Sequence, residues 1–193
     1  MMRHVLFWFI VAGLVHGAPK VENPGFESGT FAVYPGYARQ NGGAIVGWKI
    51  EGNVGINPVF APKARQAFSD NGRIPEGRQV AFLQNCGKLS QEIAGFEPGK
   101  RYRVCFRENA RHNHAPDRNP RLKVTLGGEV IVSEHAVLPV GGFEEYGTPY
   151  ARVESAVFTA PRAGAFELVF ETTFADRVAV LLDQITIEEL PQP

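Results

Sequence analysis

A run of basic side chains between residues 100 and 123 is the strongest candidate for a binding function in this sequence. It holds eight basic residues and two acidic ones, so its local net charge is +6. The basic residues are Lys100, Arg101, Arg103, Arg107, Arg111, Arg118, Arg121 and Lys123. Arginine forms planar, paired hydrogen bonds with carboxylate or sulfate oxygens, and it stacks on flat groups. The run therefore predicts recognition of an acidic or polyhydroxylated glycan.

The spacing within this run predicts which side chains point outward. Tyr102, Val104 and Phe106 alternate with Arg103 and Arg107, which is typical of a strand with one buried face. If the apolar residues pack in the core, the arginines face outward and the polar positions continue into the next loop. The predicted ligand-binding residues are Gln84, Arg103, Arg107, Asn109 and Arg111.

An alternative is that these arginines form ion pairs across strands with Glu154, Glu167 and Glu171. A neutral protein usually balances its strand charges locally, and this sequence has 20 basic and 20 acidic residues. Each exposed pair would contribute at most about 1 kcal/mol. The same neutral balance gives no indication of nucleic-acid binding.

Sequence motifs for catalysis are missing. There is no G-x-S-x-G, H-E-x-x-H or Walker sequence. The adjacent pairs Glu144-Glu145 and Glu188-Glu189 would point to opposite faces of a strand, so they do not form a catalytic carboxylate pair. We therefore expect a protein that is not an enzyme, and a glycoside hydrolase is the less favoured alternative.

The N-terminus has the form of a secretory signal peptide over residues 1–18. Arg3 and His4 precede an apolar run from Val5 to Val15, and the small residues Gly17 and Ala18 follow. The run is too short to cross a bilayer, which takes roughly 20 apolar residues. We expect residues 19–193 to form one domain that is secreted, periplasmic or held at the cell surface, with no membrane span.

Cys86 and Cys105 are the only cysteines. An exported chain permits a disulfide between them, which would stabilise the fold by roughly 3 kcal/mol in the chain-entropy model. Two free thiols are an equal alternative, since Cα atoms that lie too far apart cannot be bridged.

The rest of the chain alternates between strand patterns and turns. The predicted strands are Ala44–Glu51, Gln79–Gln84, Lys88–Ile93, Arg101–Glu108, Arg121–Leu126, Glu129–Glu134, Ala151–Thr159, Ala165–Thr173 and Val178–Ile187. Only Asn57–Phe68 shows helical spacing, and Pro62 limits it to a turn or two. Nine strands in one domain predict an all-β fold, a two-sheet antiparallel β-sandwich of the jelly-roll type. We expect Trp48 to pack in its core rather than against a sugar.

Several short segments occur in a familiar order. They are NPGFESG, GW, GRQVAFLQ, LSQEIAGFEPGKRYRVCF, LKVTLGG, FTAPRAGAFELVFETT and VLLDQITI. This order resembles galactose-binding-like jelly-roll domains, especially carbohydrate-binding modules and related plant cell-wall domains of unknown function. The resemblance covers nearly all of residues 19–193.

The resemblance also implies a structural calcium ion that joins the first and last strands. Glu27 and Asp183 stand at the matching positions, and calcium binds carboxylate and carbonyl oxygens. Asp183 follows three apolar residues, where an unpaired carboxylate would be costly to bury. The alternative is that Glu27 caps backbone amides and Asp183 serves a turn.

These observations together predict an exported, non-catalytic, calcium-stabilised carbohydrate-binding protein whose ligand is a polysaccharide on one sheet face. A structural or adhesive cell-surface domain that binds protein is the alternative, because fold alone does not choose between them.

Overall fold

The computed structural model describes residues 17–28, 44–58, 71–112, 118–173 and 178–192. None of these residues forms a helix that could span a membrane. Residues 1–16 of the predicted leader lie outside the described ranges. So does most of the predicted helical turn at Asn57–Phe68, whose first two residues belong to a strand.

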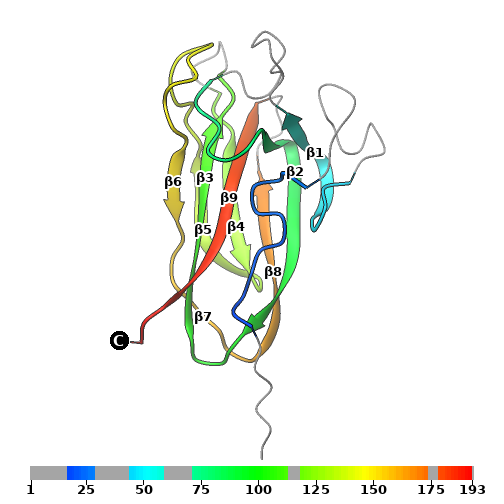
Figure 1. Ribbon diagram of the computed structural model, residues 1–193, viewed down its shortest axis with the longest axis vertical. Helices are drawn as coiled ribbons and strands as arrows, with labels where there is room; N and C mark the ends of the chain where they lie inside the picture. Colours follow the sequence, from blue (N-terminus) through cyan, green and yellow to red (C-terminus); the bar gives the residue numbers. More distant parts are fainter. Residues whose placement is uncertain (1–16, 29–43, 59–70, 113–117, 174–177, 193) are drawn as a thin grey trace, which may run out of the picture.

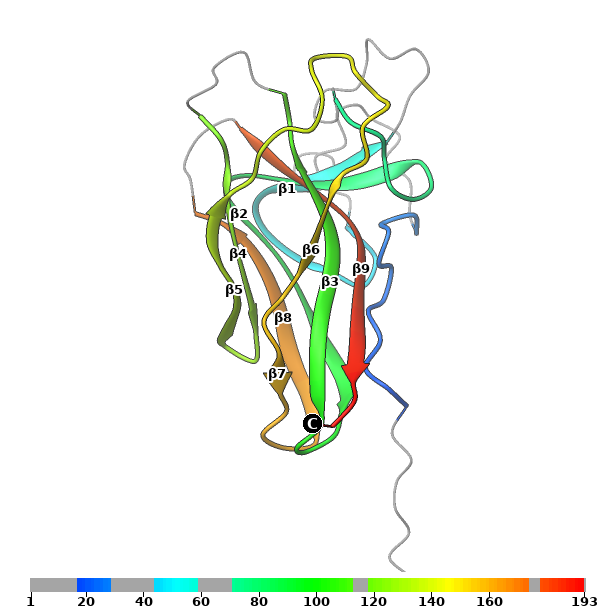
Figure 2. The same cartoon turned by 90° about the vertical axis from the view of Figure 1, so that its left-hand side faces the viewer.

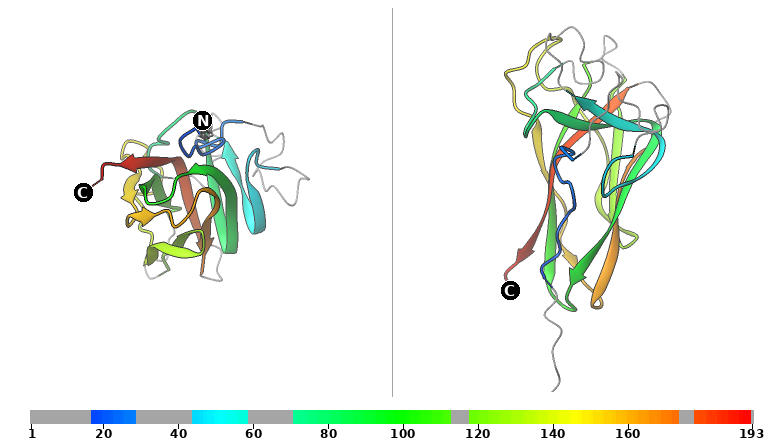
Figure 3. Two further views of the ribbon diagram at one scale, coloured as in Figure 1. Left: turned by 90° about the horizontal axis from the view of Figure 1, so that it is seen from below. Right: turned by 45° about the vertical axis from the view of Figure 1, so that its right-hand side comes forward.

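The regular structure of the described residues consists of β-strands, as the sequence predicted. The strands are β1 Lys49–Pro58, β2 Gln79–Phe96, β3 Arg101–Ala110, β4 Arg121–Leu126, β5 Glu129–Ala136, β6 Ala151–Glu154, β7 Phe158–Thr159, β8 Gly164–Thr172 and β9 Ala179–Leu190. They pair antiparallel in the order β5-β4-β8-β2-β9-β3-β6, with β1 beside β2 and β7 beside β3. The sheet curls around a central core, so the predicted β-sandwich is confirmed (Figures 1 and 3).

Strand β2 belongs to both layers of the sandwich. Its first part, Ala81–Gln84, pairs with β9, and its second part, Lys88–Phe96, pairs with β8. Between them, Asn85 and Cys86 have positive φ angles of 50° and 58°. This bend lets one strand pass from one layer to the other, although the sequence predicted two separate strands there.

Close approach of two backbones accompanies this bend. Gly87 faces β1 so closely that an added Cβ atom would lie 2.8 Å from the carbonyl oxygen of Asn53 and 2.9 Å from that of Gln84. A Cβ atom added to Gly52 on β1 would in turn lie 3.1 Å from the Cα atom of Gly87. The bend therefore requires residues without side chains where the two strands cross.

The main core fills the space between the layers. Tyr102, Val104 and Phe106 of β3 are buried in it, which confirms the predicted alternation. Phe106 packs edge-on against Phe170 with ring centroids 5.1 Å apart. Trp48 is only 7% exposed and packs against the same Phe170, so its predicted core position is also confirmed.

A second apolar cluster lies on the opposite side of the β2-β9-β3 layer. It consists of Val80, Phe82, Tyr150, Ala179 and Leu181, with Ile74 and Val140 packed on it. We call the side of β3, β6 and β9 that faces away from the main core the outer face. The segments 71–78 and 137–150 cover its upper half (Figure 2). Its lower half carries polar and charged side chains instead.

The two cysteines are both free thiols, so the disulfide alternative is wrong. Strand β9 separates β2 from β3, and the residues that Gln84 and Cys105 pair with, Ala179 and Thr186, are seven positions apart on it. Seven residues of strand span about 23 Å. A disulfide requires Cα atoms within about 7 Å of each other.

The crossing of β1 and β2 leads to a first prediction. Substitution Gly87→Ala should destabilise the fold by about 1–3 kcal/mol, because backbone atoms cannot move aside as a flexible side chain can. The control is Gly147→Ala, since no atom lies within 4 Å of an added Cβ there. Thermal unfolding of both variants measures the difference. Equal melting temperatures for the two variants would contradict this account of the bend.

Candidate functional site

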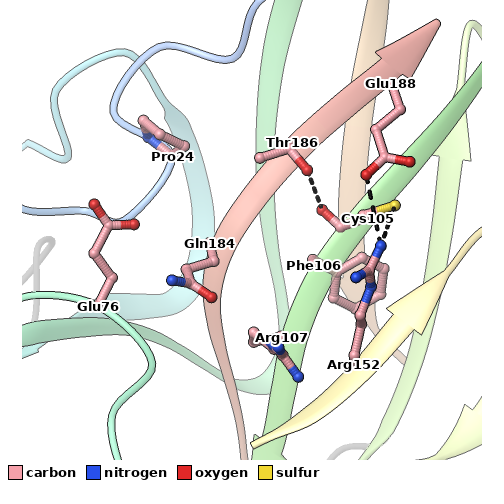
Figure 4. A pocket seen from close by; sticks show the side chains of 9 residues that line it. All are labelled: Pro24, Glu76, Cys105, Phe106, Arg107, Arg152, Gln184, Thr186 and Glu188. Carbon is pink, nitrogen blue, oxygen red and sulfur yellow. Dashed lines mark hydrogen bonds and ion pairs between the residues drawn. The ribbon is translucent and has the colours of Figure 1, made fainter.

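A polar pocket of about 300 Å³ opens on the uncovered half of the outer face (Figure 4). Strands β3, β6 and β9 form its floor and walls, and two loop residues form its rim. The lining residues are Pro24, Glu76, Cys105, Phe106, Arg107, Arg152, Gln184, Thr186 and Glu188. Since Phe106 points into the main core and is 1% exposed, the pocket offers mainly charged and polar groups.

A bulge in β9 shapes one side of this pocket. Cys105 pairs with Thr186 and Arg107 pairs with Asp183, so β9 has one more residue than β3 between these two pairs. Gln184 takes a positive φ angle of 49° at this point. The bulge also frees the N–H of Ile185, which donates to the carbonyl oxygen of Pro24 at 3.0 Å. It therefore attaches the N-terminal segment to β9 beside the pocket.

Most charges near the pocket are paired with each other. The Nη1 atom of Arg103 lies 2.6 Å from Oε2 of Glu154, as the ion-pair alternative predicted for this residue. Arg152 contacts Glu154 at 3.1 Å and Glu188 at 3.5 Å. Arg152 also donates to Sγ of Cys105 at 3.9 Å. Burial raises the pKa of the Cys105 thiol, although Arg152 acts in the opposite direction.

Arg107 differs from these residues. Its Nη1 donates to the carbonyl oxygen of Tyr150 at 3.3 Å. Within the described part of the chain, no carboxylate lies close enough to form an ion pair with it. It therefore lines the pocket with most of its hydrogen-bond donors unused.

Of the five predicted ligand-binding residues, Arg107 alone lines this pocket. Asn109 is fully buried, donates to the carbonyl oxygen of Asn71 at 3.1 Å and accepts from the N–H of Val140 at 2.9 Å. It holds the two covering segments onto β3. Gln84 is 5% exposed and lies within β2. Arg111 follows β3, and its backbone N–H donates to the carbonyl oxygen of Ala179, which extends the pairing of β3 with β9 by one residue.

Sequence reasoning missed five polar residues of the pocket, and a signal existed for three of them. Gln184 and Glu188 share a face of β9 with Thr186, as the alternation in QITIE suggests. Arg152 lies on a short strand, and Glu76 lies in a loop with no periodic pattern.

Glu76 at the rim lies near two further carboxylates, and we call Glu27, Glu76 and Asp183 the acid cluster. Asp183 is fully buried and accepts hydrogen bonds from the N–H groups of Glu76 at 3.0 Å and Gln184 at 2.7 Å. A Cβ atom added to Gly25 would lie 3.1 Å from Oε2 of Glu76 and 3.4 Å from Oδ1 of Asp183. These two carboxyl groups therefore approach the same backbone position.

Glu27 uses one oxygen, Oε1, to accept from the N–H groups of Arg78 at 2.8 Å and Gln79 at 2.7 Å. This is the amide-capping role foreseen as the alternative to metal binding. A second hollow of about 430 Å³ adjoins the acid cluster and shares Pro24 and Glu76 with the pocket. No set of three or more His, Cys, Asp or Glu residues in the described ranges is arranged as a metal site.

The electrostatics of Asp183 reflect its position. Burial is the main reason that its pKa is raised to about 7. The negative charges of Glu76 and Glu27 also raise this pKa, whereas its two amide hydrogen bonds lower it. The site therefore favours a proton or a cation at Asp183 near neutral pH.

A family profile described as HpiC1 cyclase matches residues 18–165, more than three quarters of the sequence. The chain belongs to the HpiC1-like family. The expectation that it is not an enzyme is therefore wrong, because this family is named for a cyclase and solved cyclases share its fold. No protein with curated function matches the sequence.

Solved structures of two kinds share this fold. The Stig cyclase Fisc from Fischerella sp. TAU is 14% identical with a TM-score of 0.61, over 91% of this chain and 99% of the cyclase. The xylan-binding CBM22-1 domain of Paenibacillus barcinonensis Xyn10C is 14% identical with a TM-score of 0.52, over 88% and 93%. TmCBM61, solved with β-1,4-galactotriose, is 17% identical with a TM-score of 0.52, over 90% and 100%. The jelly-roll fold of carbohydrate-binding modules is thus confirmed.

The raised pKa of Asp183 predicts how the metal-free protein responds to pH. The folded chain keeps a proton on Asp183 up to about pH 7, whereas the unfolded chain loses it near pH 4. Stability should therefore decrease as pH rises between these values, by at most about 4 kcal/mol from this group. Thermal unfolding from about pH 5 to about pH 8 with chelator present measures this loss.

The variant Asp183→Asn should show a smaller decrease over the same range, because its amide does not titrate. Glu129→Gln, which removes an exposed carboxylate on β5, should behave like the parent. If Asp183→Asn has the same pH dependence as the parent, Asp183 is not the titrating group.

Proposed function

We propose that this chain is an enzyme that closes a ring or rearranges a small molecule by proton transfer in the outer-face pocket. The observation that carries this proposal is the pocket itself, which places two carboxylates and two guanidinium groups around one small space in a member of a cyclase family. Its volume of about 300 Å³ is at the lower end of the range for small-molecule sites.

The two carboxylates have different surroundings. Glu188 contacts Arg152, whereas Glu76 has no cationic partner in the described ranges and reaches the pocket from the rim. A positioned carboxyl group can give a proton to one substrate atom, and a carboxylate can take one from another. We assign this exchange to Glu76, and we assign orientation of the substrate to Arg107 and Arg152. Because the substrate gains one proton and loses one, the product has the same composition.

This balance gives a direct test. Purified protein is incubated with a small-molecule extract of its source organism and followed by chromatography with mass detection. We expect a new species of unchanged mass, formed by the parent and by Glu167→Gln, a control on the distant strand β8. Glu76→Gln should form it at least about a hundredfold more slowly, since general acid–base groups contribute that much. No isomer at stoichiometric protein, or unchanged rates in Glu76→Gln, would contradict the proposal.

A polysaccharide is the second candidate ligand for the same face. The pocket is open to solvent along the sheet, and its walls carry the hydrogen-bonding side chains of Gln184, Thr186 and Arg107. Two proteins of the same fold are named for binding xylan or were solved with galactotriose. On this proposal the enzyme would act on the terminal sugar of a polysaccharide, either acidic or neutral, because only the end of such a chain fits into the pocket.

Calcium binding at the acid cluster is a further part of the proposal. Asp183 is buried next to two other carboxylates, and Glu27 keeps Oε2 available while Oε1 accepts its two amide bonds. Glu27 and Asp183 would hold the ion, and its positive charge would offset theirs. Export, proposed from the leader at residues 1–18, would place the chain among extracellular proteins, whose calcium sites are typically weak.

Calcium should therefore raise the melting temperature at pH 8. Free calcium at a hundred times its Kd would add about 2.7 kcal/mol, which corresponds to roughly 5–10 °C for a domain of this size. Asp183→Asn should lose most of this rise, while Glu129→Gln should keep it. An unchanged midpoint after chelation, with no metal found by elemental analysis, would remove the ion from this account.

A further inference from the structure

We infer that the outer-face pocket accepts a ligand with a single anionic group, such as a carboxylate, which binds to Arg107 with Gln184 beside it. The inference rests on the proposed function, in that it assigns a substrate class to the same pocket. It depends on which charges around the pocket are already balanced.

The balanced charges form one connected group. Arg103, Glu154, Arg152 and Glu188 are linked by contacts of 2.6, 3.1 and 3.5 Å. This group contains two positive and two negative charges, so it has no net attraction for an ion. A ligand that displaced Arg152 would leave Glu188 without its ion-pair partner, whereas Glu154 would keep Arg103.

Arg107 lies outside this group and adds a positive charge to the pocket wall. A guanidinium group has five N–H donors, and the carbonyl oxygen of Tyr150 accepts from Nη1 of Arg107. The remaining donors have the fork geometry that binds both oxygens of a carboxylate. Lysine could not replace this geometry, because its ammonium group is a point charge.

Gln184 provides a second donor at the same place. Its backbone N–H donates a hydrogen bond to the side-chain carboxylate of Asp183. Its side-chain amide lines the pocket and has no hydrogen-bond partner among the described residues. The β9 bulge fixes its position, with a φ angle of 49°. An anion bound to Arg107 can therefore accept a further hydrogen bond from the amide of Gln184.

Glu76 limits the ligand to one anionic group. Figure 4 shows Glu76 and Arg107 on either side of Gln184. A second negative charge near Glu76 would be repelled, whereas a hydroxyl group could donate to its carboxylate.

The test uses D-glucuronate and D-glucose as probes, which share a pyranose ring and differ in charge. Binding is measured by titration at low salt and at about 0.15 M salt. The parent should bind glucuronate at least about tenfold more tightly than glucose, and salt should weaken only the glucuronate complex. Equal affinity for the two sugars, or no binding of glucuronate, would overturn the inference.

Two arginines on the same strand make a matched pair of variants. Arg107→Gln should reduce glucuronate affinity by roughly tenfold or more. Arg101→Gln removes the same charge from the other end of β3, where Arg101 lies outside the pocket and donates to the carbonyl oxygen of Pro191, so it should retain the parental affinity. Arg107→Lys, which keeps the charge without the fork, should fall between them. Parental affinity in a folded Arg107→Gln variant would overturn the inference.

The outcomes separate this inference from the proposed function. Loss of isomer formation in Glu76→Gln, without Arg107-dependent glucuronate binding, would support the enzyme and overturn the anionic ligand. Binding that depends on Arg107, without any isomer formation, would support the anionic ligand and contradict the enzyme.

Discussion

The buried carboxylate of Asp183 determines the arrangement of everything around the candidate site. Three segments that are distant in the sequence meet at it: the loop that carries Glu76, the N-terminal segment at Gly25, and the bulge of β9. A carboxylate that is removed from water must receive hydrogen bonds or a positive charge. The N–H groups of Glu76 and Gln184 supply the hydrogen bonds, so the loop and the bulge must take the conformations that direct those groups inward.

The same requirement positions the pocket. Gln184 reaches the pocket because its backbone turns so that its N–H can donate to the carboxylate of Asp183. Pro24 reaches the pocket because the bulge leaves the N–H of Ile185 free to donate to the carbonyl oxygen of Pro24. The pocket wall formed by β3 and β6 has a different origin. There, alternate side chains of two paired strands neutralise one another and leave Arg107 as the charge without a carboxylate nearby in the described ranges.

Patterns of period two made most strands predictable, and β4 was predicted with its observed bounds. The core face of β3 was predictable for the same reason, and so was the outward direction of Arg107. The continuous β2 was not, because Asn85, Cys86 and Gly87 have the composition of a turn and act here as a bend within one strand. Asn109 was misjudged because its neighbours from segments 71–78 and 137–150 are distant in the sequence. Membership of a cyclase family could not be predicted, since the carboxylates of the proposed active site come from separate elements and form no local motif.

The pairing of β2 has a consequence for synthesis of the chain on the ribosome. Its first part is bordered by β1 and by β9, which follows the other strands of the described residues along the chain. While β9 is still within the exit tunnel, Ala81–Gln84 has one sheet edge open, and β3 also lacks its neighbour on that side. Open edges of this kind can pair with other chains. The nascent chain therefore has to remain incompletely folded until β9 emerges, and insertion of β9 between β2 and β3 is the step that joins these two strands into one sheet.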